Sequence, residues 1–131
     1  MLFVADRKVD QRGRMDLIGV CEKVYSFNVP LKIEGLKVVL RLFPSDGALL
    51  NEPVKLKLSF KLGAREISKI ELEDRLTIDE GDGWSPAFDI STVMFPAYAD
   101  YQVSFYVNGK KIITRDFSVV RESDLAKPVD Y

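Results

Sequence analysis

The chain has 131 residues, of which 47% are hydrophobic, with a formal net charge of −1, one cysteine and no histidine. This length and composition predict a single soluble domain that buries its own core, and Cys21 alone cannot form an internal disulfide or a cysteine-ligated metal centre. The absence of histidine excludes Ser-His-Asp and Cys-His hydrolases and His-ligated zinc or iron sites, so we expect a protein that is not an enzyme and has no cofactor.

The first half of the chain contains short apolar segments separated by turn residues. We predict four strands there, over residues 2–5, 15–20, 24–27 and 36–43. Asp10–Gly13 and Pro44–Gly47 have the composition of turns. Pro30 suits a strand end because it has no backbone N–H for a central ladder.

Alternation continues through the middle of the chain. In residues 54–61 apolar side chains alternate with lysine or serine, which predicts a strand with one buried and one solvated face. Residues 64–78 are more ambiguous, because Ile67 and Ile70 also fit helical spacing, but we favour a strand. Three further elements are predicted to follow: a loop over residues 79–83, a strand over 86–91 and a corner over 95–98.

Residues 101–120 predict a long antiparallel hairpin. The first arm places Tyr101, Val103, Phe105 and Val107 on one face, as the two-residue period of a strand requires. The dipeptide Asn108-Gly109 then tolerates positive φ at both central positions of a tight type I′ turn.

These elements together predict an all-β fold. About eight short strands separated by turns favour a two-sheet antiparallel β-sandwich of immunoglobulin-like form, which we assign to residues 1–120. Tyr101 resembles the tyrosine corner of such folds, in which the hydroxyl bonds to backbone upstream. Residues 121–131 are a polar tail that we expect to fray.

Two blocks of sequence suggest a family. They are Ala5-Asp6 with Gly13–Val20, and the closing block Tyr101–Lys110. In these blocks the chain resembles an uncharacterised family of small bacterial domains, catalogued only as a domain of unknown function. The resemblance implies a β-sandwich and brings no catalytic residues.

Charge is distributed unevenly along the chain. Residues 31–65 carry seven basic and three acidic side chains, whereas residues 66–100 carry two basic and nine acidic ones. Such asymmetry can guide association with a partner of complementary pattern. A basic face is one interpretation, and it would contain Lys55, Lys57, Lys61, Lys37 and Arg41. The alternative, which we favour, is a solvated face whose lysines block edge-to-edge pairing.

The acidic loop at residues 79–83 could be a metal-binding site. Asp79, Glu80 and Asp82 supply the oxygen ligands that calcium prefers. The alternative, which we favour, is a solvated turn, because Asp and Gly are ordinary turn residues.

Aromatic residues gather before and within the hairpin. Trp84 and Tyr106 are the candidates for an exposed protein-binding patch, because Tyr106 falls opposite Phe105 by phase and such residues anchor interfaces. Phe88 and Phe95 are expected in the core. We interpret Cys21 as a buried thiol.

Asp6, Asp10 and Asp16 could serve as an acid and base pair in a glycosidase. Two of the three fall at predicted turns or strand ends, where Asp is ordinary, so we do not favour catalysis.

Our leading hypothesis for function is a non-catalytic protein-interaction or structural module whose partner is another subunit or itself. The alternatives are a calcium-dependent binding domain and a component of a viral or phage particle, the latter on fold analogy alone. A nucleic-acid partner is not favoured, because the net charge is near zero and no aromatic side chains lie between the lysines to stack on bases. No apolar run approaches the roughly 20 residues of a membrane span, and residues 1–5 lack the apolar core of a signal peptide, so we expect a cytoplasmic protein.

Overall fold

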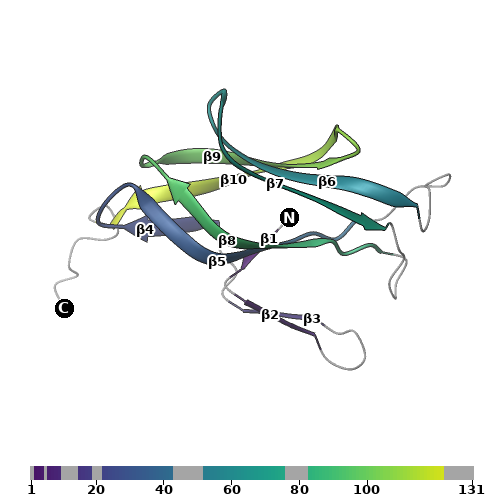
Figure 1. Cartoon of the computed structure of the whole chain (residues 1–131). Coiled ribbons are helices and arrows are strands. Elements are labelled where there is room, and N and C mark those ends of the chain that lie inside the picture. Colours follow the sequence, from purple (N-terminus) through teal and green to yellow (C-terminus); the bar gives the residue numbers. More distant parts are fainter. Residues whose placement is uncertain are drawn as a thin grey trace.

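A computed structural model describes residues 2–4, 6–9, 15–18, 22–42, 52–75 and 83–122, and most of them lie in strands (Figure 1). The strands are β1 (Leu2–Val4), β2 (Asp6–Val9), β3 (Met15–Ile18), β4 (Lys23–Ser26), β5 (Leu31–Val39), β6 (Pro53–Leu62), β7 (Arg65–Arg75), β8 (Ala87–Phe95), β9 (Ala99–Val107) and β10 (Lys110–Arg121).

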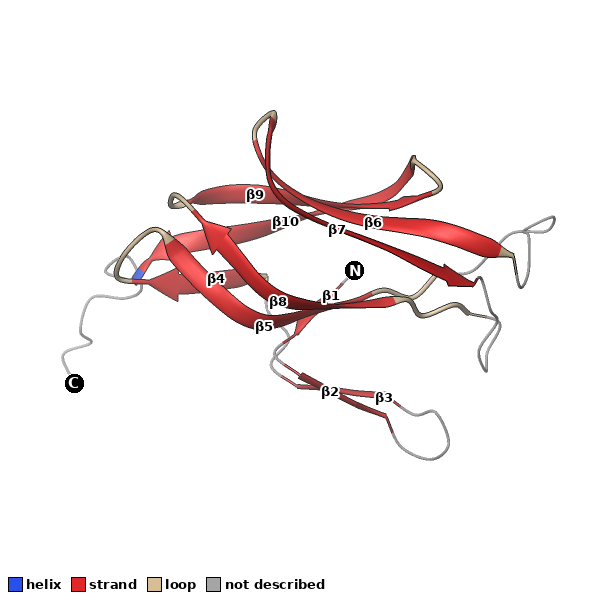
Figure 2. Ribbon diagram, in the orientation of Figure 1, coloured by secondary structure: helices blue, strands red, loops and turns tan. Residues whose placement is uncertain are grey.

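Two sheets of these strands pack face to face (Figures 1 and 2). One sheet has the order β1-β5-β8 and the other has the order β4-β10-β9-β6-β7, while β2 and β3 form a separate two-stranded ribbon. The predicted all-β sandwich is therefore confirmed. Among the described strands, all pairings are antiparallel except that of β4 with β10, which is parallel, so the expectation of purely antiparallel sheets is wrong at this edge.

The core lies between the inner faces of the two sheets. Its apolar members are Phe3, Leu36, Val38, Leu40, Val54, Leu56, Leu58, Phe60, Trp84, Phe88, Ile90, Val93, Phe95, Tyr101, Val103, Phe105, Phe117 and Val119. Phe95 of β8 is central among them, because its ring meets rings from three strands of the opposite sheet. Ring centroids lie 4.9 Å away at Tyr101, 5.3 Å at Phe117 and 6.1 Å at Phe60.

The terminal hairpin forms as predicted. Val107 pairs with Lys110, and the turn residues Asn108 and Gly109 have φ values of +49° and +82°. The Asn108 N–H donates to the Lys55 carbonyl at 2.8 Å, and the Lys55 N–H donates to the Asn108 side-chain oxygen at 2.9 Å. The turn is therefore fastened to β6 as well as closed on itself.

The upstream hydrogen bond predicted for Tyr101 is also present. Its buried hydroxyl donates to the Ala97 carbonyl at 2.6 Å and accepts from the Ala97 N–H at 3.0 Å. Both backbone groups of Ala97 are thus satisfied by one side chain. These bonds fix the corner between β8 and β9, which occupies residues 96–98.

Several strand limits differ from the predictions. The strand expected over residues 36–43 begins at Leu31 and ends at Val39, and the strand expected to end at residue 91 continues to Phe95. The earlier start of β5 and the later end of β8 have one cause, because the inward and outward alternation of both strands reverses at the level of Gly35, where φ is +72°. The ambiguous segment 64–78 does form a strand, β7, whereas β2 was not predicted.

Some predictions fall outside the described residues. They are the turns at residues 10–13 and 44–47, Cys21, most of the acidic loop at residues 79–82, and the tail from residue 123.

The turn chemistry generates a first prediction. Replacing both Asn108 and Gly109 by alanine should lower the free energy of unfolding by at least about 1–2 kcal/mol, because position 109 gains a Cβ at positive φ and alanine at position 108 tolerates positive φ less well than asparagine. Urea denaturation measures the loss. Asn108→Gly is the matched control, because it keeps the allowed φ and loses only the side-chain acceptor for the Lys55 N–H. An unchanged stability of the double variant would contradict the turn assignment.

The corner generates a second prediction. Tyr101→Phe should lower the free energy of unfolding by about 1–3 kcal/mol, because the Ala97 N–H and C=O lose their common partner. Tyr98→Phe is the control, because the Tyr98 hydroxyl makes one bond, to the Ser26 carbonyl, on a half-buried residue. Equal losses in the two variants would show that the corner does not depend on the Tyr101 hydroxyl.

Candidate functional site

The lysines of β6 do not form a uniform basic face, because β7 places carboxylates beside them. Lys55 pairs with Glu73 and Lys57 with Glu71 across the β6–β7 ladder, and Lys61 pairs with Glu66 beyond a bulge. Opposite charges therefore alternate over the outer side of the five-stranded sheet.

Lys37 and Arg41 do not join these lysines, so that part of the basic-face interpretation, which the sequence did not favour, is wrong. Lys37 lies on β5 in the other sheet, where its ammonium is 3.5 Å from the Asp89 carboxylate. Arg41 follows β5 and donates a hydrogen bond to the Ser85 hydroxyl at 3.0 Å.

A polar cluster surrounds Glu66 on the outer face. The Ser59 hydroxyl donates to Glu66 Oε2 at 2.6 Å, and Lys57 Nζ lies 3.3 Å from the same oxygen. The Ser59 bond, and then the bond and charge of Lys57, hold the pKa of Glu66 below its usual 4.5 against an opposing effect of desolvation. Lys57 Nζ also lies 5.5 Å from the ring centre of half-buried Tyr106.

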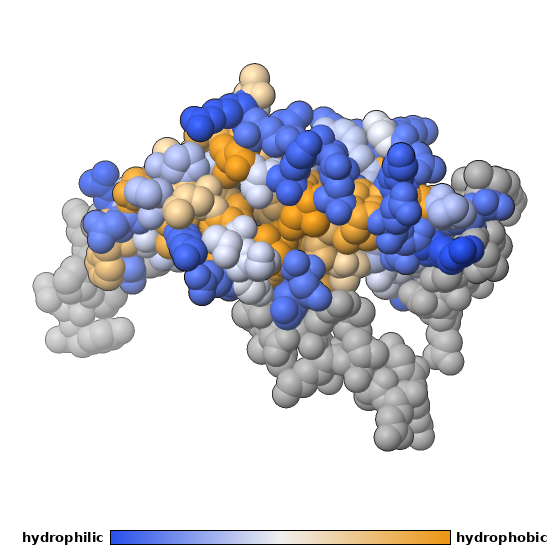
Figure 3. Space-filling model, viewed as in Figure 1, coloured by the Kyte–Doolittle hydropathy of each residue, from blue (hydrophilic) through white to orange (hydrophobic). Residues whose placement is uncertain are grey.

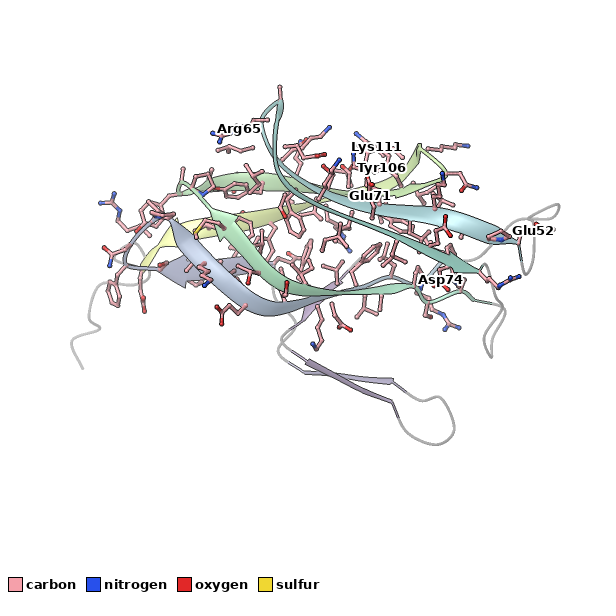
Figure 4. The ribbon with its side chains drawn as sticks, viewed as in Figure 1. Glu52, Arg65, Glu71, Asp74, Tyr106 and Lys111 are labelled. Atoms are coloured by element: carbon pink, nitrogen blue, oxygen red, sulfur yellow. The ribbon has the colours of Figure 1, made fainter. Side chains whose placement is uncertain are left out.

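Figure 4 labels Tyr106 on β9 and Glu71 on β7, which lie on the same side of the sheet. A hollow of about 410 Å³ opens near them, lined by Lys55, Leu56, Lys57, Glu71, Leu72, Glu73 and Gly109. Each lysine of the hollow stands beside a carboxylate, so an anionic ligand would have to compete with the glutamates.

Trp84 does not join Tyr106 in an exposed patch, so this prediction is wrong. The Trp84 side chain belongs to the core and is 4% exposed. Its backbone forms a bridge with Leu42, with N–H to carbonyl distances of 2.6 and 2.7 Å in the two directions. This bridge continues the contact between the chain segments that follow β5 and precede β8, and it directs the indole inward.

Among the described residues, the most exposed aromatic side chains lie on edge strand β4 and just after it. Phe27 is 73% exposed and Tyr25 is 43% exposed. We call these two side chains the aromatic tip. The sequence pattern of residues 24–27 predicts an ordinary apolar strand and does not mark Phe27 as exposed. The available signal was the position of Phe27 between polar Ser26 and Asn28, before a proline that interrupts the strand pattern.

The tip has a firm support. β4 pairs with β10 from Ser118 to Arg121, and the Tyr98 hydroxyl donates to the Ser26 carbonyl at 3.1 Å. The guanidinium of Arg121 lies 5.1 Å from the centre of the Tyr98 ring. The backbone of Ser26, between Tyr25 and Phe27, is thus fixed both to β10 and to Tyr98.

The proposed calcium ligands Asp79, Glu80 and Asp82 lie outside the described residues. Among the residues that are described, no group of three or more acidic or cysteine side chains is arranged to hold a metal ion. That same part of the chain contains no helix with the length and apolar character needed to cross a membrane.

The Glu66 cluster generates a third prediction. A depressed folded pKa means that ionised Glu66 stabilises the fold above its unfolded pKa of 4.5, and that this stabilisation disappears as pH falls through the folded pKa. Glu66→Gln should therefore reduce stability by about 0.2–1 kcal/mol near neutral pH, a small amount because the pair is partly exposed. The difference from wild type should shrink as pH falls below 4.5 and vanish once Glu66 is protonated in the folded protein.

Urea denaturation at several pH values measures this difference, and Glu73→Gln on the same strand is the control. If Glu66→Gln lowered the free energy of unfolding by the same amount at neutral and at acid pH, the stabilisation would not come from the charge of Glu66.

Comparison with known proteins identifies a family. A search of curated proteins and a search of solved structures each find no match. The model of DUF6941, described as a family of unknown function, matches residues 1–120. This match spans β1 to β9 and nearly all of β10. The chain therefore belongs to the DUF6941 family of unknown function.

Proposed function

We propose that the protein is a non-catalytic interaction module that binds another protein through the aromatic tip. The observation that carries this proposal is the 73% exposure of Phe27 beside half-exposed Tyr25 on a strand edge. Burial of aromatic side chains is the main source of affinity in many interfaces, and one such ring buries about 150–250 Å². Two rings in adjacent outward positions form a compact anchor for an apolar pocket on a partner.

The support of the tip favours binding over mere exposure. Parallel pairing with β10 and the Tyr98–Ser26 bond limit the backbone freedom that a partner would otherwise have to restrict. Arg121 pairs with Ser26 in the same ladder and adds a cation at the rim of the tip. The preferred partner surface is therefore apolar at its centre, with acidic groups at its edge.

The setting of the module is part of the proposal. A single cysteine suits the reducing cytoplasm, and the sequence blocks quoted above favour a bacterial source. The Tyr101 hydroxyl bonds to Ala97 support an immunoglobulin-like arrangement of the strands.

The proposal generates a fourth prediction, on partner binding. The tagged wild-type protein should capture a partner from a lysate of its source cells, and titration with the purified partner should give a dissociation constant for comparison. Phe27→Ser should weaken this binding by about tenfold or more, because it removes the central anchor. Tyr106→Ala is the matched control, since it removes an aromatic ring from the outer face of β9.

Binding that survives Phe27→Ser but not Tyr106→Ala would move the site to the hollow beside β6 and β7. Hydrolysis of a substrate by the purified protein, abolished by a single carboxylate substitution, would overturn the non-catalytic proposal as a whole.

A further inference from the structure

The edges of the two sheets are protected to very different degrees. Proteins avoid unwanted strand pairing with short edge strands or with charged side chains. β1 has three residues and β4 has four, whereas β7 is long but has seven charged residues among its eleven. β8 is the exception, because its nine residues contain no proline or lysine and one charged side chain, Asp89.

β8 lies on the side of the sandwich that faces the viewer in Figure 1, with β7 above it. In the same view, Figure 3 shows apolar side chains in the band between the two sheets. A strand added to β8 in the described part of the structure would extend the three-stranded sheet and cover part of this side.

The burial pattern of β8 is symmetric about its middle. Side chains of residues 88, 90, 93 and 95 are buried, and those of residues 89, 91, 92 and 94 are exposed. From Phe88 to Phe95 the side chains point in, out, in, out, out, in, out and in, and the order is the same from Phe95 back to Phe88. An antiparallel copy centred between Ser91 and Thr92 would match every inward residue with an inward one and every outward residue with an outward one.

β5 already demonstrates that such a strand fits against β8. From Leu31 to Val38 it has the same order of inward and outward positions, with its two consecutive outward residues at Glu34 and Gly35. The ladder between β5 and β8 keeps one register across this reversal, from Leu31 opposite Phe95 to Val38 opposite Phe88. A strand without the same reversal would place apolar side chains on the wrong face past Ser91.

We propose that the free edge of β8 pairs with β8 of a second copy of this chain, antiparallel and centred between Ser91 and Thr92. The result is a continuous six-stranded sheet across a two-fold axis. This proposal concerns a different surface from the aromatic tip and does not depend on it.

Charge and exposure support this register. Asp89 would stand opposite Met94 of the second copy, so no like charges face each other. Within each chain, Lys37 pairs with Asp89 and Lys32 pairs with Met94. Across the joined sheet these pairs would form one row of outward side chains, in the order Lys37, Asp89, then Met94 and Lys32 of the second copy. Each Asp89 thus lies between cations of both chains, and Met94, which is 46% exposed, gains a neighbour.

The first test is concentration-dependent association of the full chain. Sedimentation equilibrium from about 1 µM to about 500 µM should detect a monomer–dimer equilibrium. Thr92→Lys should weaken the dimer by about tenfold, because two added cations would meet near the two-fold axis. Gln102→Lys, an exposed change on the other sheet, and Phe27→Ser should both leave the dimer constant unchanged.

The second test reads the register directly, in a Cys21→Ser background. In the variant carrying both Asp89→Cys and Met94→Cys, the opposed positions would have Cα atoms about 4.5–5.5 Å apart, within disulfide range, so mild oxidation should give a covalent dimer. Either cysteine alone should not crosslink, because like positions of the two copies lie about 16 Å apart along the strands.

Two results would overturn the proposal. One is a monomer at every concentration together with no crosslink specific to the double-cysteine variant. The other is a dimer that ignores Thr92→Lys and is lost with Phe27→Ser, because self-association would then occur through the aromatic tip.

Discussion

The packing of Phe95 against three rings of the opposite sheet is the contact on which the sandwich depends. Phe95 ends β8, and its neighbour Tyr101 begins the inward series of β9, with ring centroids 4.9 Å apart. The same Tyr101 uses its hydroxyl to hold both backbone groups of Ala97 in the corner that joins the two strands. The chain is thus fixed at the point where it passes from one sheet to the other, which sets the phase that directs Val103 and Phe105 inward.

A second constraint is the shared reversal of β5 and β8. At Gly35 the backbone takes a positive φ, which glycine allows at little cost, and the inward and outward positions exchange in both strands at the same level. The register between the strands does not change, so the core remains filled on both sides of the reversal. The exposed side of this sheet consequently presents consecutive outward residues, including Ser91 and Thr92, where a regular strand would present every second one.

Sequence reasoning succeeded where the signal is local. The β6 alternation up to Leu58, the Asn108-Gly109 turn and the Tyr101 corner depend on residues close in the chain, and all three are present. It failed where a contact between distant segments decides exposure. Trp84 is buried where its backbone pairs with Leu42, and Phe27 is exposed just beyond the ladder in which β4 joins β10.

The candidate site illustrates the same difference. Lys55, Lys57 and Lys61 were correctly expected on the outer face of one strand, but their electrostatic character could not be deduced without knowing which strand lies beside them. The uneven charge of the chain changes near the Gly63–Ala64 turn, and the β6–β7 hairpin folds the basic part onto the acidic part. Much of the asymmetry that suggested an external partner is thereby balanced within the molecule.

The two proposed modes of association, aromatic contact and strand pairing, use two separate edges of the sandwich. The aromatic tip belongs to the β4 edge of the five-stranded sheet, and β8 is an edge of the three-stranded sheet. Because the surfaces do not share residues, pairing through β8 leaves both tips of a dimer available. A partner with two tip-binding sites would be held by both, and its second contact would form at the high effective concentration set by the first. If both proposals hold, self-pairing and partner binding would reinforce each other, and a tip of modest affinity would be sufficient for stable capture.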